Sequence, residues 1–359
     1  MVDAVVKSFE VTVQDMREIS KRLTAACEKG LENEEKAVVK MFITYVHSLP
    51  DGTEEGDFLA LDLGGSNFRV LQLSLERGGK MTAEPKVEEM RISKEKKEGN
   101  QEELFDFIAE SMSDFLKKHG ITRRLPLGFT FSFPVVQTSL TAGTLKKWTK
   151  DFKAAGAEGR DVTQMLQEAI ARRKSGDVSV DVVALLNDTT GTQLAVGFED
   201  PNCHVGLILG TGTNACYMEK TAAIPKFTGD RSKFPDVIVN CEWGAFGEDG
   251  SMDDWLTDYD KAVEEKVINR GQQIFEKLIS GKYLGSVTHA ALLKLTRDKV
   301  LFGGVCSERF SELVIDRFDS AFLSVIEGEN GMEKCKELFK KEFPDGSVGV
   351  RLRDCQASV

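Results

Sequence analysis

One pattern occurs twice in this chain of 359 residues and constrains its fold more than any other feature. Residues 58–75, FLALDLGGSNFRVLQLSL, form two alternating apolar runs joined by a glycine turn, which is typical of a β-hairpin. Residues 205–220, VGLILGTGTNACYMEK, repeat the order of strand, glycine turn, Ser or Thr, Asn and strand. Two such hairpins on either side of a domain boundary predict a duplicated core with a cleft between its halves.

The segments around the hairpins alternate between helices and strands, which indicates an α/β architecture. Apolar residues at helical spacing predict helices over residues 16–46 and 104–116, and Asp161 is a candidate N-cap for a helix that ends near Arg173. LPLGFTFSFP reads as a strand, and VSVDVVALLND as a strand covered on both faces. The charged segment 92–102 is expected to be mobile, and residues 49–57 are a candidate domain crossing.

The composition narrows the class of protein. The net charge of −11, from 47 basic and 58 acidic residues, argues against broad binding to nucleic acid or to a membrane surface. No apolar run approaches a membrane span, and the N-terminus lacks the apolar core of a signal peptide. The cysteines form no CxxC pair, and with four scattered histidines they predict reduced thiols in a cytoplasmic protein without a zinc site: Cys27, Cys203, Cys216, Cys241, Cys306, Cys335 and Cys355.

The glycine turns allow more than one interpretation. GTGTNA matches the glycine spacing of a dinucleotide-binding fingerprint, but that fingerprint needs a helix after the turn, and ACYMEK reads as a strand. No GxxxxGK[ST] run occurs, which excludes a P-loop. Two interpretations remain: purely structural hairpins, or turns whose exposed N–H groups hold phosphate oxygens. In the second, Asp62 would hold the accompanying magnesium ion and Arg69 would supply a permanently charged donor.

Several longer motifs point to one family. In chain order they are FLALDLGGSNFRV, LGFTFSFP, WTKDFKAAGAEGRDV, LLNDTTGT, LGTGTNACY, CEWGAFGEDG and GQQIFEKLISGKYLG. On these motifs the chain resembles the eukaryotic hexokinase family, within the wider group of sugar kinases, Hsp70 and actin, as far as about residue 330. The resemblance implies a two-domain actin-like ATPase (ribonuclease H-like) α/β fold with an interdomain cleft. It also implies phosphorylation of a hexose such as glucose at its 6-hydroxyl with ATP and Mg²⁺, the entry step of glycolysis.

The resemblance also implies roles for individual residues. Asp188 resembles the catalytic base, and Lys150 is placed to stabilise charge near the transferred phosphoryl group. The residues that resemble sugar ligands are Ser132, Thr149, Lys150, Asn187, Asp188, Asn214, Glu242 and Glu276. Those that resemble the two phosphate loops are Asp62, Gly64, Gly65, Ser66, Asn67 and Arg69 in the first, and Gly210, Thr211, Gly212 and Thr213 in the second. Asp62 is also the implied Mg²⁺ residue, through a water molecule.

Three of these carboxylates have simpler interpretations when each is taken alone. Asp188 could be a helix N-cap, Glu276 a solvated residue on a helix, and Glu242 an ordinary loop carboxylate. The agreement of the motifs outweighs these interpretations. Asp151 departs from the family, which usually has glycine after WTK, and this departure affects the loop next to the predicted catalytic lysine.

The resemblance implies a small domain over residues 53–188 and a large domain over 1–52 and 189–359. In the family, the catalytic unit continues beyond the point where this chain stops, with the strand and the helix start that bind adenosine. We therefore expect a large domain truncated at its C-terminus, with an exposed sheet edge. The alternative function is a hexokinase-like sugar-binding or sensor protein that does not turn over ATP. The preferred hexose and the oligomeric state stay open.

Overall fold

The computed structural model describes residues 1–65, 67–150, 152–173, 180–301, 304, 308–315, 318–328 and 330–342. Packing divides the chain into two units. The sheet unit comprises Lys29–Ile208 and Asn214–Glu242, and the helical unit comprises Met1–Glu28, Leu209–Thr213 and Trp243–Val359. The small and large domains expected from the sequence differ in extent from these units. The predicted domains are defined by how they move relative to each other, and a division by packing does not test such motion. Their boundaries therefore stay a prediction.

A six-stranded sheet in the order β4–β3–β2–β6–β9, with β5 also paired to β3, is the main sheet of the sheet unit. Its strands are β2 (Gly56–Leu63), β3 (Asn67–Glu76), β4 (Lys80–Met81), β5 (Lys86–Arg91), β6 (Leu125–Phe131) and β9 (Val180–Leu186). The antiparallel pair β2–β3 confirms the first predicted hairpin. β6 runs parallel to both β2 and β9, so the C-terminal ends of these three strands meet at one edge of the sheet.

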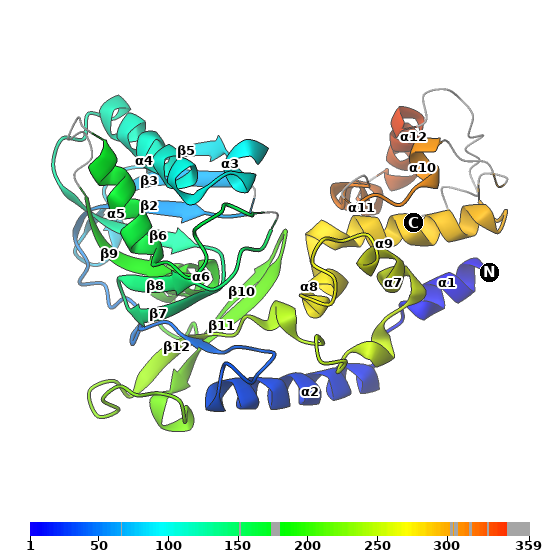
Figure 1. Ribbon diagram of the computed structural model, residues 1–359, viewed down its shortest axis with the longest axis horizontal. Helices are drawn as coiled ribbons and strands as arrows, with labels where there is room; N and C mark the ends of the chain where they lie inside the picture. Colours follow the sequence, from blue (N-terminus) through cyan, green and yellow to red (C-terminus); the bar gives the residue numbers. More distant parts are fainter. Residues whose placement is uncertain are drawn as a thin grey trace. The chain divides into compact units, whose positions relative to one another are not determined.

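The core of the sheet unit lies between this sheet and two helices, α4 (Gln101–Lys118) and α5 (Val162–Arg172), which lie side by side (Figure 1). Alternate residues of β2 point into this core, so Leu61 and Leu63 are fully buried while Asp62 is only half-buried. Asp161 caps α5 by accepting a hydrogen bond of 2.8 Å from the N–H of Gln164, as predicted. The predicted apolar face of α4 is buried: Leu104, Phe105, Ile108, Met112, Phe115 and Leu116.

A second sheet in the same part of the chain has the order β1–β12–β11–β10. Its strands are β1 (Phe42–Ile43), β10 (Val205–Leu209), β11 (Thr213–Lys220) and β12 (Asp236–Asn240), and the pair β10–β11 confirms the second predicted hairpin. The predicted helix over residues 16–46 is wrong in its second half, because α2 (Val13–Glu32) ends at Glu32. The N–H of Met41 donates to the carbonyl of Cys241 at 3.1 Å, and such long-range pairing overrides the helical spacing.

Of two further predictions, the one for β9 is wrong, and the mobility of residues 92–102 stays a prediction. Residues 92–102 contain α3 (Lys94–Glu98) and the start of α4, and the side chains of Ser93 and Asn100 cap these two helices. β9 is not covered on both faces, because alternate residues such as Val183 are exposed; it is also the last strand in the order of its sheet. An apolar run of this length is compatible with an edge strand as well as with a buried one.

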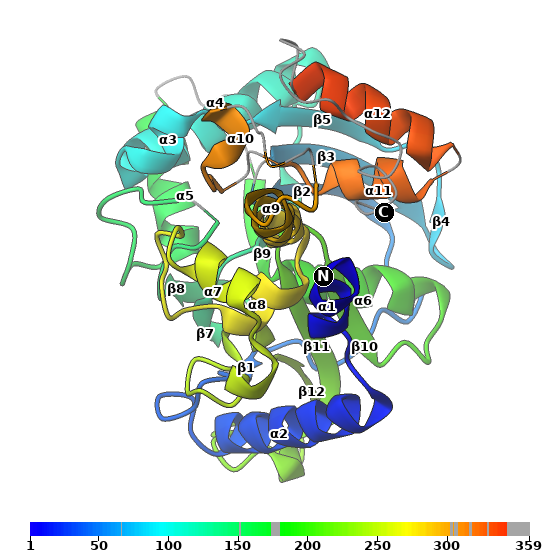
Figure 2. The ribbon, with the colours of Figure 1, turned by 90° about the vertical axis from the view of Figure 1, so that its right-hand side faces the viewer.

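The remaining elements of the sheet unit are a hairpin of β7 (Val135–Ser139) and β8 (Ala142–Leu145), and α6 (Asp188–Glu199), which contacts β6 and β12. In the helical unit α9 (Gly281–Arg297) is contacted by α7 (Asp258–Glu264), α8 (Ile274–Ile279) and α11 (Ala321–Glu327). Figure 2 shows α9 in a view along its helix axis. The unit also contains α1 (Val2–Ser8), α2 as far as Glu28, α10 (Glu308–Ser311), α12 (Gly331–Glu342) and the short 3-10 helices η2 (Trp243–Ala245) and η3 (Asp253–Trp255). None of the helices in the described part of the chain is long and apolar enough to cross a membrane.

The buried face of β2 allows a test of the fold. Leu61 is 0% exposed and lies opposite Val70 on β3 and Phe129 on β6. We expect Leu61→Ala to lower the free energy of unfolding by about 2–5 kcal/mol, because it removes apolar contacts and leaves a cavity. Val87→Ala on β5, where the side chain is 53% exposed, should change it by less than about 0.5 kcal/mol. Urea denaturation measures both, and equal midpoints for the two variants would contradict this core.

Candidate active site

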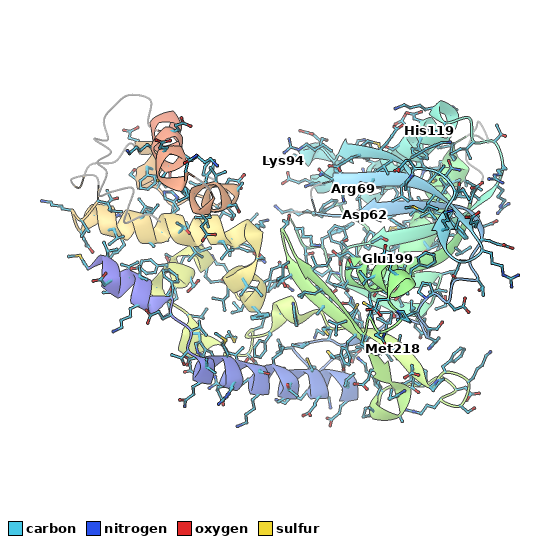
Figure 3. All side chains as sticks on the ribbon, turned by 180° about the vertical axis from the view of Figure 1, so that it is seen from behind. Asp62, Arg69, Lys94, His119, Glu199 and Met218 are labelled. Carbon is cyan, nitrogen blue, oxygen red and sulfur yellow. The ribbon has the colours of Figure 1, made fainter. Side chains whose placement is uncertain are left out.

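The first glycine turn joins β2 to β3 at the edge where the parallel strands end. The N–H of Gly64 donates to the carbonyl of Asn67 at 3.1 Å, which closes the turn. Arg69 lies opposite Asp62 in the hairpin and pairs with it at 3.1 Å (Figure 3). The same guanidinium donates to Glu89 on β5 at 2.8 Å, and the amide of Asn67 donates to the other oxygen of Glu89. The predicted phosphate-loop residues are therefore brought together here; Ser66 lies outside the described residues.

Asp62 lies in an unfavourable environment for a charged carboxylate. Burial raises the pKa of its carboxyl, and the charge of Asp188 acts in the same direction, whereas Arg69 and Lys150 lower it. The net direction is upward, so the neighbouring cations offset the cost of burial only in part. A carboxylate in this position gains from an additional cation.

Two residues that support this turn were not predicted. Glu89 holds the side chains of Asn67 and Arg69 together, as described above. Lys97, on α3, donates to the carbonyl of Gly65 at 2.7 Å, and its ammonium lies 5.1 Å from the ring centre of Phe152. The sequence around these two residues does not predict their contacts, because a charged residue on a strand or on a short helix is normally expected to face solvent.

Lys150 lies between the first glycine turn and the N-terminus of α6. A β-carbon at Gly65 would lie 3.0 Å from Cδ of Lys150, so any larger residue would push the lysine side chain away from its present position. The ammonium donates to the carbonyl of Ser132 at 2.9 Å and lies 3.9 Å from the carboxylate of Asp188. The φ of Lys150 is 55°, a left-handed conformation that is strained for a residue other than glycine.

An aromatic cluster holds the loop that carries Thr149 and Lys150. The rings of Trp148 and Phe152 each lie with their centres 4.8 Å from that of Phe133, and the Trp148 indole donates to the carbonyl of Ala154 at 2.9 Å. This packing stabilises the strained backbone. Within the described part of the chain no hydrogen bond is seen for the Thr149 side chain, and its role as a sugar ligand stays a prediction. Asp151 lies outside the described residues.

Asn187 and Asp188 begin α6 at the end of β9. Asn187, not Asp188, is the N-cap: its side chain accepts from the N–H of Thr189 at 3.0 Å and from the Thr189 hydroxyl at 2.7 Å. Asp188 is the first helical residue, and its carboxylate also accepts from the N–H of Thr189, at 2.9 Å. The same carboxylate lies 3.9 Å from the ammonium of Lys150. The simpler interpretation of Asp188 as the cap is therefore wrong.

Asn214 and Glu242 lie at neighbouring ends of β11 and β12. The side-chain amide of Asn214 donates to Glu242 Oε1 at 3.1 Å, and the backbone N–H of Glu242 donates back to Asn214 Oδ1 at 3.0 Å. The same amide lies 3.4 Å from Asn187 Oδ1, which connects this pair to the start of α6. Glu242 has a φ of 54°, so it shares the strained conformation of Lys150. Glu242 is held by hydrogen bonds through both its side chain and its backbone.

The second glycine turn belongs to the helical unit and is held from α8 and α9. The carbonyl of Gly210 accepts from the N–H of Gly281 at 2.8 Å, and that of Thr211 accepts from the N–H of Lys282 at 3.2 Å. Glu276 accepts from the N–H of Thr213 at 3.0 Å, so its interpretation as a solvated residue is wrong. Gly212 completes the turn by accepting from Gly210 at 2.9 Å. The role of this turn as a phosphate loop stays a prediction.

The described residues contain no group of three or more His, Cys, Asp or Glu side chains that could hold a metal ion on their own. A single carboxylate completed by water and substrate oxygens, as expected at Asp62, falls outside that description. Mg²⁺ is commonly held by one or two carboxylates together with phosphates and water.

Comparisons with known proteins agree with this arrangement. Two hexokinase family models match residues 1–198 and 204–358. The structure superposes on that of a hexokinase from Schistosoma mansoni complexed with glucose with a TM-score of 0.90 and 39% identity, covering 99% of this chain and 79% of that one. A second hexokinase crystal structure matches with a TM-score of 0.76 and 28% identity, again covering 99% of this chain and 79% of the other. The fold is therefore the actin-like ATPase fold expected from the sequence.

The chain belongs to the hexokinase family. It is 46% identical to rat hexokinase-1 over 331 residues and 44% identical to human hexokinase-2 over 344 residues. These matches cover 91% and 95% of this chain but only 35% and 37% of the relatives. The chain thus spans about a third of the length of these curated relatives.

The pKa of Asp62 gives a stability prediction. Because its folded-state pKa is raised, the stability that this group contributes is present below the unfolded pKa and is lost as pH rises through the folded pKa. Ionised Asp62 therefore destabilises the ligand-free protein at neutral pH. We expect Asp62→Asn to be more stable than the parent at pH 7, with the difference vanishing as pH falls below about 4, the ordinary range of Asp.

Urea denaturation of the ligand-free proteins at several pH values measures this difference. Asp181→Asn is the matched control, because Asp181 is a paired but 54% exposed carboxylate on the same sheet, and its loss should not stabilise. A less stable Asp62→Asn protein at pH 7 would show that the pair with Arg69 outweighs burial.

Proposed function

We propose that this chain transfers a phosphoryl group from ATP to the 6-hydroxyl of a hexose such as glucose, with Mg²⁺ as the cofactor. The observation that carries the proposal is the set of contacts from the first glycine turn through Lys150 to Asp188. It places a carboxylate that can accept a proton next to an ammonium that can stabilise phosphoryl charge. Family membership supports the same reaction.

Asp188 is the general base in this mechanism. Its carboxylate takes the proton of the 6-hydroxyl as the hydroxyl oxygen forms a bond to the γ-phosphorus of the donor. The bond between that phosphorus and the bridging oxygen breaks, and the bridging oxygen leaves on ADP. Lys150 lies 3.9 Å from Asp188 and stabilises the charge of the transferred group.

The hexose is held by amides and carboxylates. A hexose offers many hydroxyls and no charge, so its recognition needs groups that accept and donate hydrogen bonds. In the sheet unit Asn187, Asn214 and Glu242 form one connected group of this kind, next to Asp188. The similarity to a hexokinase complexed with glucose supports glucose as the sugar. Ser132, Thr149 and Glu276 complete the proposed set of ligands.

The residues of the first turn fit a polyphosphate with its metal. Gly65 leaves room that a β-carbon would take from Lys150, and Asp62 is a half-buried carboxylate whose charge is only partly offset. Asp62 would hold Mg²⁺ through water, and the bound ion would neutralise charge on the phosphates. Arg69 holds Asp62 in place from β3.

Replacement of Asp188 tests the role of the base. We expect Asp188→Asn to lower kcat for glucose phosphorylation by about 10²–10⁴-fold, because the amide cannot accept the hydroxyl proton, while glucose still binds. Glu199→Gln, an exposed change at the other end of the same helix, should keep the parental rate. A coupled assay for glucose 6-phosphate measures the rates. Parental activity in Asp188→Asn would overturn this mechanism.

Separate calorimetric titrations with glucose and with Mg-ATP distinguish the kinase from the sugar-sensor alternative. We expect the parent chain to bind both ligands, because sugar ligands and phosphate-turn residues are present in the same chain. Binding of glucose with no detectable binding of nucleotide would favour the sensor. Each titration needs only the purified chain, so it is independent of the assay for turnover.

We also propose that the protein is cytoplasmic. Cys27, Cys203 and Cys216 form no disulfide, and burial raises the pKa of Cys27 and of Cys216 to about 11, which makes these two thiols unreactive. Fractionation of cells that express the protein tests the location, and recovery from the secreted fraction would contradict it.

A further inference from the structure

Asn240 is a buried polar residue of the sheet unit that is not itself one of the proposed sugar ligands. It is the last residue of β12 and is 4% exposed. Its strand lies between β1 and β11, where Asn240 pairs with Phe42 on one side and with Cys216 on the other. The backbone of Asn240 is therefore fixed from both sides. A polar side chain at such a site is costly unless its hydrogen bonds are made.

The side chain of Asn240 bonds to two of the proposed sugar ligands. Its Nδ2 donates to Glu242 Oε1 at 2.9 Å, and its Oδ1 accepts from Asn214 Nδ2 at 2.7 Å. Asn214 Nδ2 also donates to Glu242 Oε1, at 3.1 Å. The three side chains thus form a closed triangle, in which one carboxylate oxygen accepts from two amides.

Only one orientation of the Asn240 amide satisfies this triangle. If the amide were rotated by 180°, its NH₂ group would face the NH₂ group of Asn214, and its oxygen would face the Glu242 carboxylate. Both contacts would be repulsive. The two donated N–H groups hold the Glu242 carboxylate in one orientation.

We propose that Asn240 is a positioning residue for hexose recognition: it orients the Glu242 carboxylate and the Asn214 amide that bind the sugar hydroxyls. The assignment rests on the proposed function, because it requires that Glu242 and Asn214 contact the sugar. It also explains why residue 242 is a hydrogen-bond acceptor, since the amides of Asn214 and Asn240 both donate to its side chain. An oriented carboxyl group accepts hydrogen bonds from hydroxyls in one fixed direction, so the site favours neutral polyhydroxyl compounds.

Asn240→Asp tests this assignment, because it keeps the shape and exchanges the NH₂ donor for an acceptor. At pH 8 the introduced carboxylate faces Glu242 without a proton, and we expect the dissociation constant for glucose to rise about tenfold or more. As pH falls, the two carboxylates take up a shared proton, which restores a donor between them. The loss of affinity should therefore shrink at pH 5.5, whereas a merely structural defect would not recover.

The control is Asn202→Asp. The Asn202 amide also donates to a carboxylate, that of Asp200 at 3.1 Å, but in an exposed loop, so the change adds the same charge without touching the triangle. Calorimetry with glucose gives the dissociation constants at both pH values, and the KM values for glucose and for ATP give a second readout. We expect the KM for glucose to rise and the KM for ATP to stay near that of the parent.

The outcomes separate the two proposals. If the parent chain does not bind glucose, the proposed function fails and the assignment of Asn240 fails with it. If the parent binds glucose and Asn240→Asp binds it equally well at both pH values, or loses affinity independently of pH, only the assignment is overturned. Asn240→Ser is the second variant in case Asn240→Asp does not fold. Its hydroxyl is too short to reach both partners, so glucose affinity should fall at every pH while ATP binding is kept, and unchanged glucose affinity would overturn the assignment.

Discussion

The position of Lys150 is the constraint on which the described site in the sheet unit depends. Its side chain packs against Gly65, its ammonium donates to the carbonyl of Ser132, and it lies 3.9 Å from Asp188. These three residues come from the first glycine turn, the end of β6 and the start of α6. One side chain therefore connects the turn with the predicted base, and its own conformation has to be fixed for that connection to hold.

Three residues in the sequence motifs have a left-handed backbone conformation. Lys150 and Glu242 have φ values of 55° and 54°, and Gln273, three residues before Glu276, has a φ of 54°. Such conformations persist only where the surroundings impose them. For Lys150 the aromatic cluster around Phe133 does so, and for Glu242 the hydrogen bond from its N–H to Asn214 contributes. Three of the non-glycine residues with positive φ thus lie in the sequence motifs, whereas Met41, Tyr45, Lys299 and Asn330 share the conformation outside them.

Local sequence rules predicted the secondary structure next to the candidate site, but not the residues that support it. Both hairpins, β6 and α5 follow local rules of alternation, glycine turns and capping, and their prediction is confirmed. The helix expected through Val46 fails, because Phe42–Ile43 pairs with β12, about 200 positions further along the chain. Lys97 and Glu89 were missed for a related reason. A charged residue that reaches a turn carbonyl or a guanidinium is indistinguishable in sequence from one that reaches water.

The two carboxylates near Lys150 have different surroundings, although they lie close to the same ammonium group. Asp188 accepts the N–H of Thr189 at the start of α6 and lies 3.9 Å from the ammonium of Lys150. Asp62 lies on β2 opposite Arg69, and burial together with the charge of Asp188 raises its pKa. A carboxylate whose charge is only partly offset can rely on a bound metal ion to complete its neutralisation. The proposed roles, base for Asp188 and metal residue for Asp62, agree with this difference in surroundings.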